Sequence, residues 1–487
     1  MAKMTTLTDE ALIAFDTLAD RSRSLLSPSL RLGVTGLSRA GKTVFITSLI
    51  HNLIHGGRLP LFEAYQSGRI SRCYLEPQPD DAIPRFQYEE HLQALINERI
   101  WPDSTRAISQ LRITIDYQSA SSWGRMLSAG KLSLDIVDYP GEWLLDLPLL
   151  GKSYKEFSAD SFKLAQEATH RDLADQWLQA ANLVHPSKPA DEITAQHLAR
   201  IFTEYLRAGK ADERALSTLP PGRFLMPGDL DGSPALTFAP LANLKQEDFN
   251  SGSLASMMER RYESYKTHVV KPFFREHIAR LDRQIVLIDA MQALNSGGAV
   301  VADLERALTD ILSCFRPGGS SLLTGLFQRR IGRILVAATK ADHLHHESHD
   351  RLEAIVRRLV ERAMQRADFS GADIDVLAMA AVRATREATV TQGKDVLPVI
   401  VGTPLRGEKI NGEIFDGETE TAIFPGDLPK NPNVIFEKNE VFHQDDALRF
   451  IRFRPPKIES TSDGITLSLP HIRLDRALQF LIGDRLS

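Results

Sequence analysis

The chain is poor in cysteine and in aromatic residues, and neither sign of charge is in strong excess. Two cysteines among 487 residues cannot form a disulfide framework, so we expect a reducing compartment, the cytoplasm. No apolar run approaches the roughly 18–20 residues that span a bilayer, so we expect no transmembrane segment, with peripheral membrane association left open. The formal net charge of -5 gives no general attraction for nucleic acid, and we expect no direct nucleic-acid partner.

The remaining composition is that of an ordinary globular protein. Hydrophobic residues make up 43% of the chain and charged residues 25%. A chain of 487 residues is long enough for two or three domains with a large core. Its function therefore has to be inferred from local motifs.

A phosphate-binding loop pattern occupies Gly36 to Thr43. The letters GLSRAGKT match G-x-x-x-x-G-K-[ST] at every fixed position. Residues 31–35 predict a strand before the loop and residues 44–50 continue in helical register after it, which is the context that this motif requires. Amides of such a loop bind polyphosphate at a helix N-terminus. The residues predicted to bind nucleotide here are Gly36, Ser38, Arg39, Ala40, Gly41, Lys42, Thr43 and Val44.

Lys42 and Thr43 have different expected roles in this loop. The ammonium of Lys42 would reach the β and γ phosphates and absorb charge during hydrolysis. The hydroxyl of Thr43 would be a ligand of Mg²⁺. Both roles follow from the residue types that the pattern fixes.

A second motif, Asp138-x-x-Gly141, ends an apolar strand predicted over residues 131–138. In phosphate-loop enzymes an acid at this place holds Mg²⁺, and the glycine amide can sense a γ-phosphate. The next residue, Glu142, stands where a water-orienting glutamine is common. Its carboxylate can accept a proton from water, but it lacks the amide donor and brings negative charge toward the phosphates. We therefore predict slow intrinsic hydrolysis.

A third motif points to the base. Residues 335–338 predict a short strand that ends in Thr339-Lys340-Ala341-Asp342, which matches [NT]-K-x-D. The carboxylate of Asp342 can accept hydrogen bonds from both N1–H and the exocyclic amine of guanine, whereas adenine offers no such pair. The stem of Lys340 would pack along the base. The motif therefore favours GTP and GDP over adenine nucleotides.

The order of these motifs resembles that of a Ras-like GTPase domain of the translation-factor-related class. Further similarity is carried by Trp101-Pro102, by residues 138–143 (DYPGEW), by residues 453–456 (FRPP) and by the ending from Leu474 to Leu486. With these segments the chain resembles the bacterial YcjX family over nearly its whole length. The resemblance implies a cytoplasmic, stress-associated GTP-binding protein with GTP or GDP and Mg²⁺ as cofactors.

Three more site residues are expected from the order of elements and from the resemblance. Thr105 precedes a strand predicted over residues 111–117, where GTPases place a threonine that closes on Mg²⁺ and the γ-phosphate. Ser104 and Thr114 are weaker candidates for this role, and a solvent-facing loop hydroxyl is the alternative for Thr105. Ala381 and Val382 follow a strand predicted over residues 374–379, where such domains offer backbone amides to guanine O6. The expected metal ligands are thus Thr43, Thr105 and Asp138, and the expected catalytic residues are Lys42, Thr105 and Glu142.

The predicted fold is α/β, a P-loop NTPase of the Ras-like type with a mostly parallel sheet flanked by helices. An apolar stripe on residues 474–482 predicts a last helix that packs on this sheet. The expected parts are a discontinuous G domain over 27–141, 283–395 and 460–487 with an enlarged first switch region over 51–110, a helical insertion over 142–282, and a β-rich excursion over 396–459.

The helical insertion over 142–282 replaces the segment through which nucleotide state is usually transmitted. We expect it to carry the surface for an unidentified protein effector, against the alternative of structural elaboration. Four histidines over residues 343–349 fit no helical metal motif, and we expect a solvated loop there.

Three function classes remain open. The leading hypothesis is a Mg²⁺-dependent molecular switch that hydrolyses GTP slowly. The second is an interaction module that bound GDP stabilises and whose turnover is incidental. The third is an ATP-dependent P-loop enzyme, such as a kinase, that happens to contain T-K-x-D.

Overall fold

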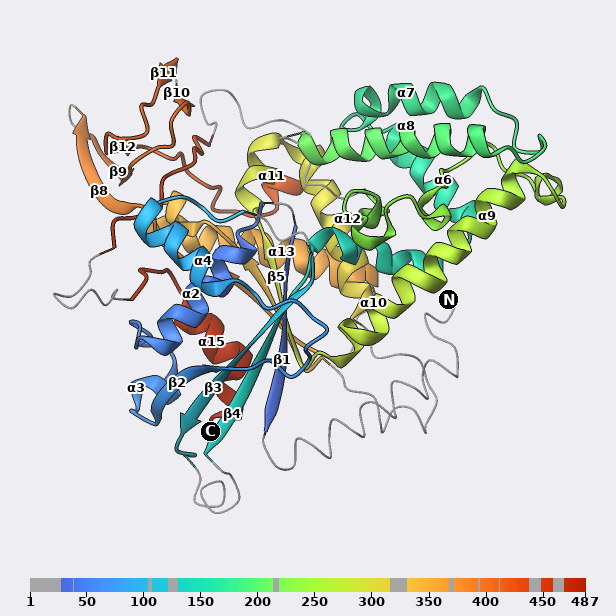
Figure 1. The fold of residues 1–487 in the computed structure, drawn as a ribbon. Coiled ribbons are helices and arrows are strands. Elements are labelled where there is room, and N and C mark those ends of the chain that lie inside the picture. Colours follow the sequence, from blue (N-terminus) through green and yellow to red (C-terminus); the bar gives the residue numbers. More distant parts are fainter. Residues whose placement is uncertain are drawn as a thin grey trace.

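The computed structural model describes residues 28–37, 39–103, 107–120, 130–212, 219–315, 331–367, 372–392, 395–410, 412–437, 448–458 and 468–487. Seven strands form the central sheet: β1 (Ser29–Gly36), β2 (Ile70–Glu76), β3 (Ser109–Tyr117), β4 (Lys131–Asp138), β5 (Arg283–Ile288), β6 (Arg333–Ala338) and β7 (Asp373–Ala378). Their order is β2-β3-β4-β1-β5-β6-β7 (Figure 1). The strands from β4 to β7 in this order pair in parallel, and β3 is antiparallel to both of its neighbours. The predicted α/β fold with a mostly parallel sheet is confirmed.

Helices cover both faces of the sheet because its central strands are apolar on both sides. In β5, Ile285 and Leu287 join one buried cluster, whereas Val286 and Ile288 join the other. The helices α2 (Lys42–Ile54) and α15 (Leu474–Ile482) contribute to the first cluster, and α12 (Gly298–Cys314) and α13 (His349–Ala367) to the second. The last helix predicted to pack on the sheet is therefore confirmed as α15.

The segment expected as an enlarged switch region, residues 51–110, is partly built into the sheet. Its strand β2 pairs antiparallel with β3 and forms an edge of the sheet. Two short helices flank that strand, α3 (Glu63–Gln66) and α4 (Tyr88–Gln93). The sequence analysis missed β2, because Ser71, Arg72 and Glu76 interrupt its apolar pattern and only Cys73 is fully buried.

The segment between Asp138 and β5 is mainly helical, as Figure 1 shows at its upper right. These helices share the buried cluster of α12 and α13, so they extend the core of the sheet on that face. Many of the shared core residues are aromatic, among them Phe157, Trp177, Phe202 and Tyr262. The elements are a 3-10 helix η2 (Gly141–Gly151), α6 (Tyr154–Ala165), α7 (Arg171–Asn182), α8 (Glu192–Ala211), α9 (Leu254–Tyr265) and α10 (Lys271–Glu276).

Residues 386–423, in the C-terminal part of the chain, form a second, smaller sheet. Its order is β12-β9-β8, and a two-stranded ribbon of β10 and β11 accompanies it. This sheet already begins at Arg386, earlier than the boundary at residue 396 that the sequence suggested. Residues 386–392 alternate poorly and carry few apolar side chains, so only their pairing with the next strand identifies them. The elements are β8 (Arg386–Gln392), β9 (Asp395–Gly402), β10 (Lys409–Ile410), β11 (Glu413–Ile414), β12 (Thr421–Ile423) and α14 (Val434–Glu437).

The helix α11 (Ala290–Ser296) follows β5, and a short π-helical turn, Lys266–Val270, joins α9 to α10. The remaining helical elements among the described residues are short 3-10 or π-helical turns. Within the described ranges, no helix combines the length and the apolar character needed to cross a bilayer.

Candidate nucleotide-binding site

The loop between β1 and α2 has the backbone of an anion-binding turn. Arg39 and Gly41 adopt left-handed conformations, with φ of 63° and 78°. The amide of Leu37 donates to the carbonyl of Leu287 (3.1 Å), which ties the loop to β5. Among the described residues, the amides of Arg39, Gly41 and Lys42 donate no hydrogen bond. An open row of amides at a helix N-terminus is the arrangement that binds phosphate.

Lys42 forms a buried ion pair with Asp138. The ammonium lies 3.1 Å from the carboxylate, and the two side chains are only 11% and 2% exposed. The pair forms because β1 and β4 are parallel neighbours, with Val34 opposite Asp138. The structure thus brings together the lysine and the acid that two separate motifs predict as site residues.

Thr43 meets the segment that leads to the predicted Thr105. Its hydroxyl donates to the carbonyl of Asp103 at 3.1 Å. Thr105 itself lies outside the described residues, as does Ser38, so both stay predictions. His91 of α4 lies near this point: burial lowers its pKa, while the charges of Asp138 and Asp103 act to raise it. The sequence analysis missed Asp103 and His91, since neither belongs to a motif.

Gly141 packs directly against the loop. A Cβ at this position would lie 1.8 Å from the carbonyl oxygen of Gly36, so only glycine fits without moving one of the two backbones. The close approach joins the D-x-x-G turn to the phosphate-binding loop. Any displacement of one is therefore felt by the other.

Glu142 is turned toward the helical segment. It is buried, and its carboxylate lies 2.8 Å from the ammonium of Lys210 at the end of α8. The expected role of Glu142 in orienting water stays a prediction. The carboxylate that would have to take this role is already paired with Lys210. Lys210 has no motif of its own, and it lies far from Glu142 in the sequence, so sequence reasoning missed the pair.

The third motif is held in place by two neighbouring strands. The ammonium of Lys340 lies 2.5 Å from Asp289, a buried residue that directly follows β5. The hydroxyl of Thr339 donates to the carbonyl of Ile288 at 3.1 Å. Asp289 was missed, although an acid at the carboxyl end of a parallel strand is a usable signal.

Asp342 is buried and fixed by the loop after β7. Its carboxylate accepts a hydrogen bond from the amide of Ala384 at 2.8 Å, and its carbonyl accepts one from the hydroxyl of Thr385. A carboxylate held in this way has one oxygen oriented and cannot rotate freely. This is what recognition of a planar base by two parallel hydrogen bonds requires.

Ala381 and Val382 lie in the loop after β7, close to α2. The hydroxyl of Ser48 in α2 donates to the carbonyl of Ala381 at 2.6 Å. Ala380 and Ile472 exchange two backbone hydrogen bonds and fix the start of the loop. Within the described ranges, the amides of Ala381 and Val382 have no acceptor, as the prediction for guanine O6 requires.

All these groups lie at the carboxyl edge of the parallel strands, which is where open α/β sheets bind their ligands. The open amides and Lys42 suit a polyphosphate, and Asp342 suits the donor edge of guanine. The oxygens of Thr43 and Asp138 are the hard ligands that Mg²⁺ prefers. The donor set therefore fits a Mg²⁺–guanine nucleotide.

The histidine loop differs from the expectation of a solvated segment. The His343 ring packs edge-on against Phe453 at 5.3 Å, and burial lowers the pKa of both His343 and His349. The expectation was wrong for His345 and His349, which are buried, and for the half-buried His343, whose packing partner Phe453 comes from a distant part of the chain. His346 is exposed and bonds Glu387 at 2.6 Å.

Comparison with known proteins agrees with this geometry. A model of the YcjX-like family, DUF463, matches residues 30–486. The chain is similar to the Ras-like GTPase YcjX of Escherichia coli (strain K12), with 37% identity over 470 residues that cover 94% of this chain and 96% of the relative. It is also similar to the protein of the same name from Shewanella oneidensis (strain ATCC 700550 / JCM 31522 / CIP 106686 / LMG 19005 / NCIMB 14063 / MR-1), with 35% identity over 500 residues, 97% of this chain and 99% of the relative. The family resemblance found in the sequence is confirmed, and so is the Ras-like fold.

The contact between Gly141 and Gly36 yields a first prediction. Gly141→Ala should lower nucleotide affinity by about tenfold or more, because the added methyl group has to push the phosphate-binding loop away. Titration with a fluorescent nucleotide measures the effect. Gly151→Ala is the matched control, since a Cβ there meets nothing within 4 Å. Equal affinities of the two variants would contradict the prediction.

Proposed function

The chain belongs to the YcjX-like family, and from this premise we propose that it is a nucleotide-dependent molecular switch that binds GTP and hydrolyses it slowly with Mg²⁺. We place it in the cytoplasm, in a bacterial stress response, as the resemblance implies. The observation that carries the proposal is the buried pair of Lys42 and Asp138 beside open loop amides. The relatives named Ras-like GTPase support the choice of guanine nucleotide.

The residues of the site have separate tasks in this proposal. Thr43 and Asp138 would hold Mg²⁺, together with Thr105. When bound, the metal compensates phosphate charge as a Lewis acid. Lys42 is the mobile cation of the site, because its ammonium can leave Asp138 for a phosphate oxygen without losing a charged partner. The loop amides stay in place and stabilise the same negative charge.

Slow turnover follows from the residue after Gly141. Glu142 carries no amide donor, and its carboxylate is engaged by Lys210. It therefore orients water less well than a glutamine would. The same observation favours the second candidate function, a module that GDP stabilises and in which hydrolysis is incidental.

We further propose that the helices of residues 142–282 present the effector surface. Asp146 of η2 lies only a few residues after Gly141 and is buried, and burial raises its pKa to about 6. Its carboxylate accepts hydrogen bonds from the amide of Gly222 (2.7 Å) and the hydroxyl of Tyr265 (2.7 Å). A nucleotide-dependent shift of η2 would therefore move groups that lie deep in the helical segment.

Base specificity provides the first test. Asp342→Asn should weaken GDP binding by about tenfold or more and strengthen binding of xanthosine diphosphate, because the amide reverses one hydrogen-bond polarity. Calorimetric titration with both nucleotides measures this change in base preference. Asp427→Asn is the control, as its carboxylate is 69% exposed and distant from the motif in sequence. A wild-type preference for ADP over GDP would point to the ATP-dependent alternative.

Hydrolysis is tested at the phosphate end. Lys42→Ala should lower the rate of phosphate release by about 100-fold or more, because the site loses its charge on the developing phosphate oxygens. Lys131→Ala, at the half-exposed start of the same strand that carries Asp138, should leave the rate unchanged. Equal rates for wild type and Lys42→Ala would show that the measured activity comes from a contaminant.

Hydrogen exchange tests whether the bound nucleotide affects the helical segment of residues 142–282. We expect slower exchange in α8 and around Gly222 with a non-hydrolysable GTP analogue than with GDP. Lys210→Met should reduce this difference, since it removes the partner of Glu142. Arg200→Met serves as the control, because Arg200 pairs with Glu204 on the exposed side of the same helix. Identical exchange of the wild type in both nucleotide states would refute the coupling.

A further inference from the structure

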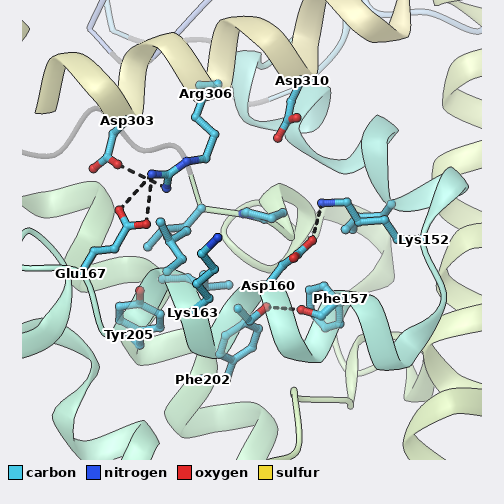
Figure 2. Close-up of a pocket in the computed structure, with 17 residues that line it drawn as sticks. Lys152, Phe157, Asp160, Lys163, Glu167, Phe202, Tyr205, Asp303, Arg306 and Asp310 are labelled. Atoms are coloured by element: carbon cyan, nitrogen blue, oxygen red, sulfur yellow. Dashed lines mark hydrogen bonds and ion pairs between the residues drawn. The ribbon is translucent and has the colours of Figure 1, made fainter. Parts of the chain in front are cut away.

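A second cavity lies in the helical segment, outside the nucleotide site. It has a volume of about 260 Å³ and opens between α6, α8 and α12 (Figure 2). Its apolar wall includes Phe157, Leu164, Phe202 and Leu206. None of the residues assigned to the nucleotide lines it.

Charged side chains lie at two ends of this cavity. At one end Arg306 binds Glu167 at 2.9 Å and approaches Asp303 at 3.4 Å. At the other end Lys152 binds Asp160 at 2.8 Å, near Asp310 (Figure 2). The lining carboxylates outnumber the lining cations by four to three, counting Asp160, Glu167, Asp303 and Asp310 against Lys152, Lys163 and Arg306.

Tyr205 supplies an unused polar group. Its side chain is only 4% exposed, its ring stacks on Trp177 at 5.5 Å, and its hydroxyl has no hydrogen-bond partner among the described residues. Figure 2 shows this hydroxyl directed into the cavity, on the side of Glu167. Burial and the nearby carboxylates raise the pKa of Tyr205, so the phenol stays neutral. A buried hydroxyl without a partner is costly, and a ligand could satisfy it.

We propose that this cavity binds a small aliphatic diamine or polyamine. Its methylene chain would lie on the apolar wall, and its ammonium groups would face the carboxylates at the two ends. The hydroxyl of Tyr205 would accept a hydrogen bond from one ammonium. The chemistry is that of a cation recognised by carboxylates and aromatic rings in a partly enclosed site.

The state of Asp310 supports a cationic ligand. Burial raises the pKa of this carboxyl, and the charges of Lys152 and Arg306 offset the burial only in part. An added positive charge would stabilise the ionised form. A dianion is disfavoured, because carboxylates outnumber cations among the residues that line the cavity.

Calorimetric titration of the full chain with 1,5-diaminopentane at physiological ionic strength tests the proposal. We expect one molecule bound per chain. Tyr205→Phe should weaken binding several-fold, and Asp310→Asn by about tenfold or more, because a hydrogen bond to a charged group is lost. Asp172→Asn, an exposed acid at the start of α7, is the control and should not change the affinity. Because Tyr205→Phe removes only one oxygen atom, this variant should fold. The proposal can therefore still be tested if Asp310→Asn does not fold.

Uncharged and anionic probes of similar length complete the test. 1,5-Pentanediol shares the carbon chain but lacks the charges, and glutarate carries the opposite charge. Binding of the diamine alone, weakened in both variants, supports the proposal. Equal binding of the diol, preferential binding of glutarate, no binding of the diamine, or unchanged affinity in Tyr205→Phe would each overturn it. The assay needs no nucleotide, so its outcome is independent of the proposed GTPase activity.

Discussion

The buried ion pair between Lys42 and Asp138 is the interaction on which the site depends. Two charges withdrawn from water are tolerated only while each compensates the other, and removal of one partner typically costs about 3–5 kcal/mol. The pair therefore fixes the first turn of α2 against the end of β4. Beside the pair, the amides of Arg39, Gly41 and Lys42 donate no hydrogen bond to any described residue and can receive an anion. Both charges of the pair can be transferred to a metal–phosphate group in one exchange.

At the same edge of the sheet, the phosphate-binding loop is linked to the helical segment through Gly141 and η2. Gly141 touches the backbone of Gly36, and the 3-10 helix that begins at Gly141 carries Glu142 and Asp146 into contacts with α8 and with the backbone of Gly222. The Asp146 contact is a buried hydrogen bond, and the Glu142 contact is an ion pair of a buried carboxylate with a partly exposed ammonium. Such contacts cannot stretch continuously, so a displaced loop has to repack them or break them.

Local motifs with a fixed backbone geometry could be predicted from the sequence, and contacts between distant segments could not. The phosphate-binding loop and the strands β1, β4 and β6 were recognisable because glycines and apolar runs determine them locally. Asp289 and Lys210 act through partners far away in the chain, and no spacing rule identifies such pairs. The polar strands β2 and β8 are stabilised by their neighbours, and the His343 ring packs against the distant Phe453.

The position of the second cavity bears on the proposed switch. Leu149 of η2 lines that cavity, and so does Pro220, which lies two residues before Gly222, a residue whose amide binds Asp146. If η2 changes position with the bound nucleotide, the shape of the cavity changes with it. Binding linkage is reciprocal, so an occupant that prefers one shape must also shift the affinity for nucleotide by the same factor. The helical segment could then receive a chemical signal as well as transmit the nucleotide state, because one buried helix is shared by both sites.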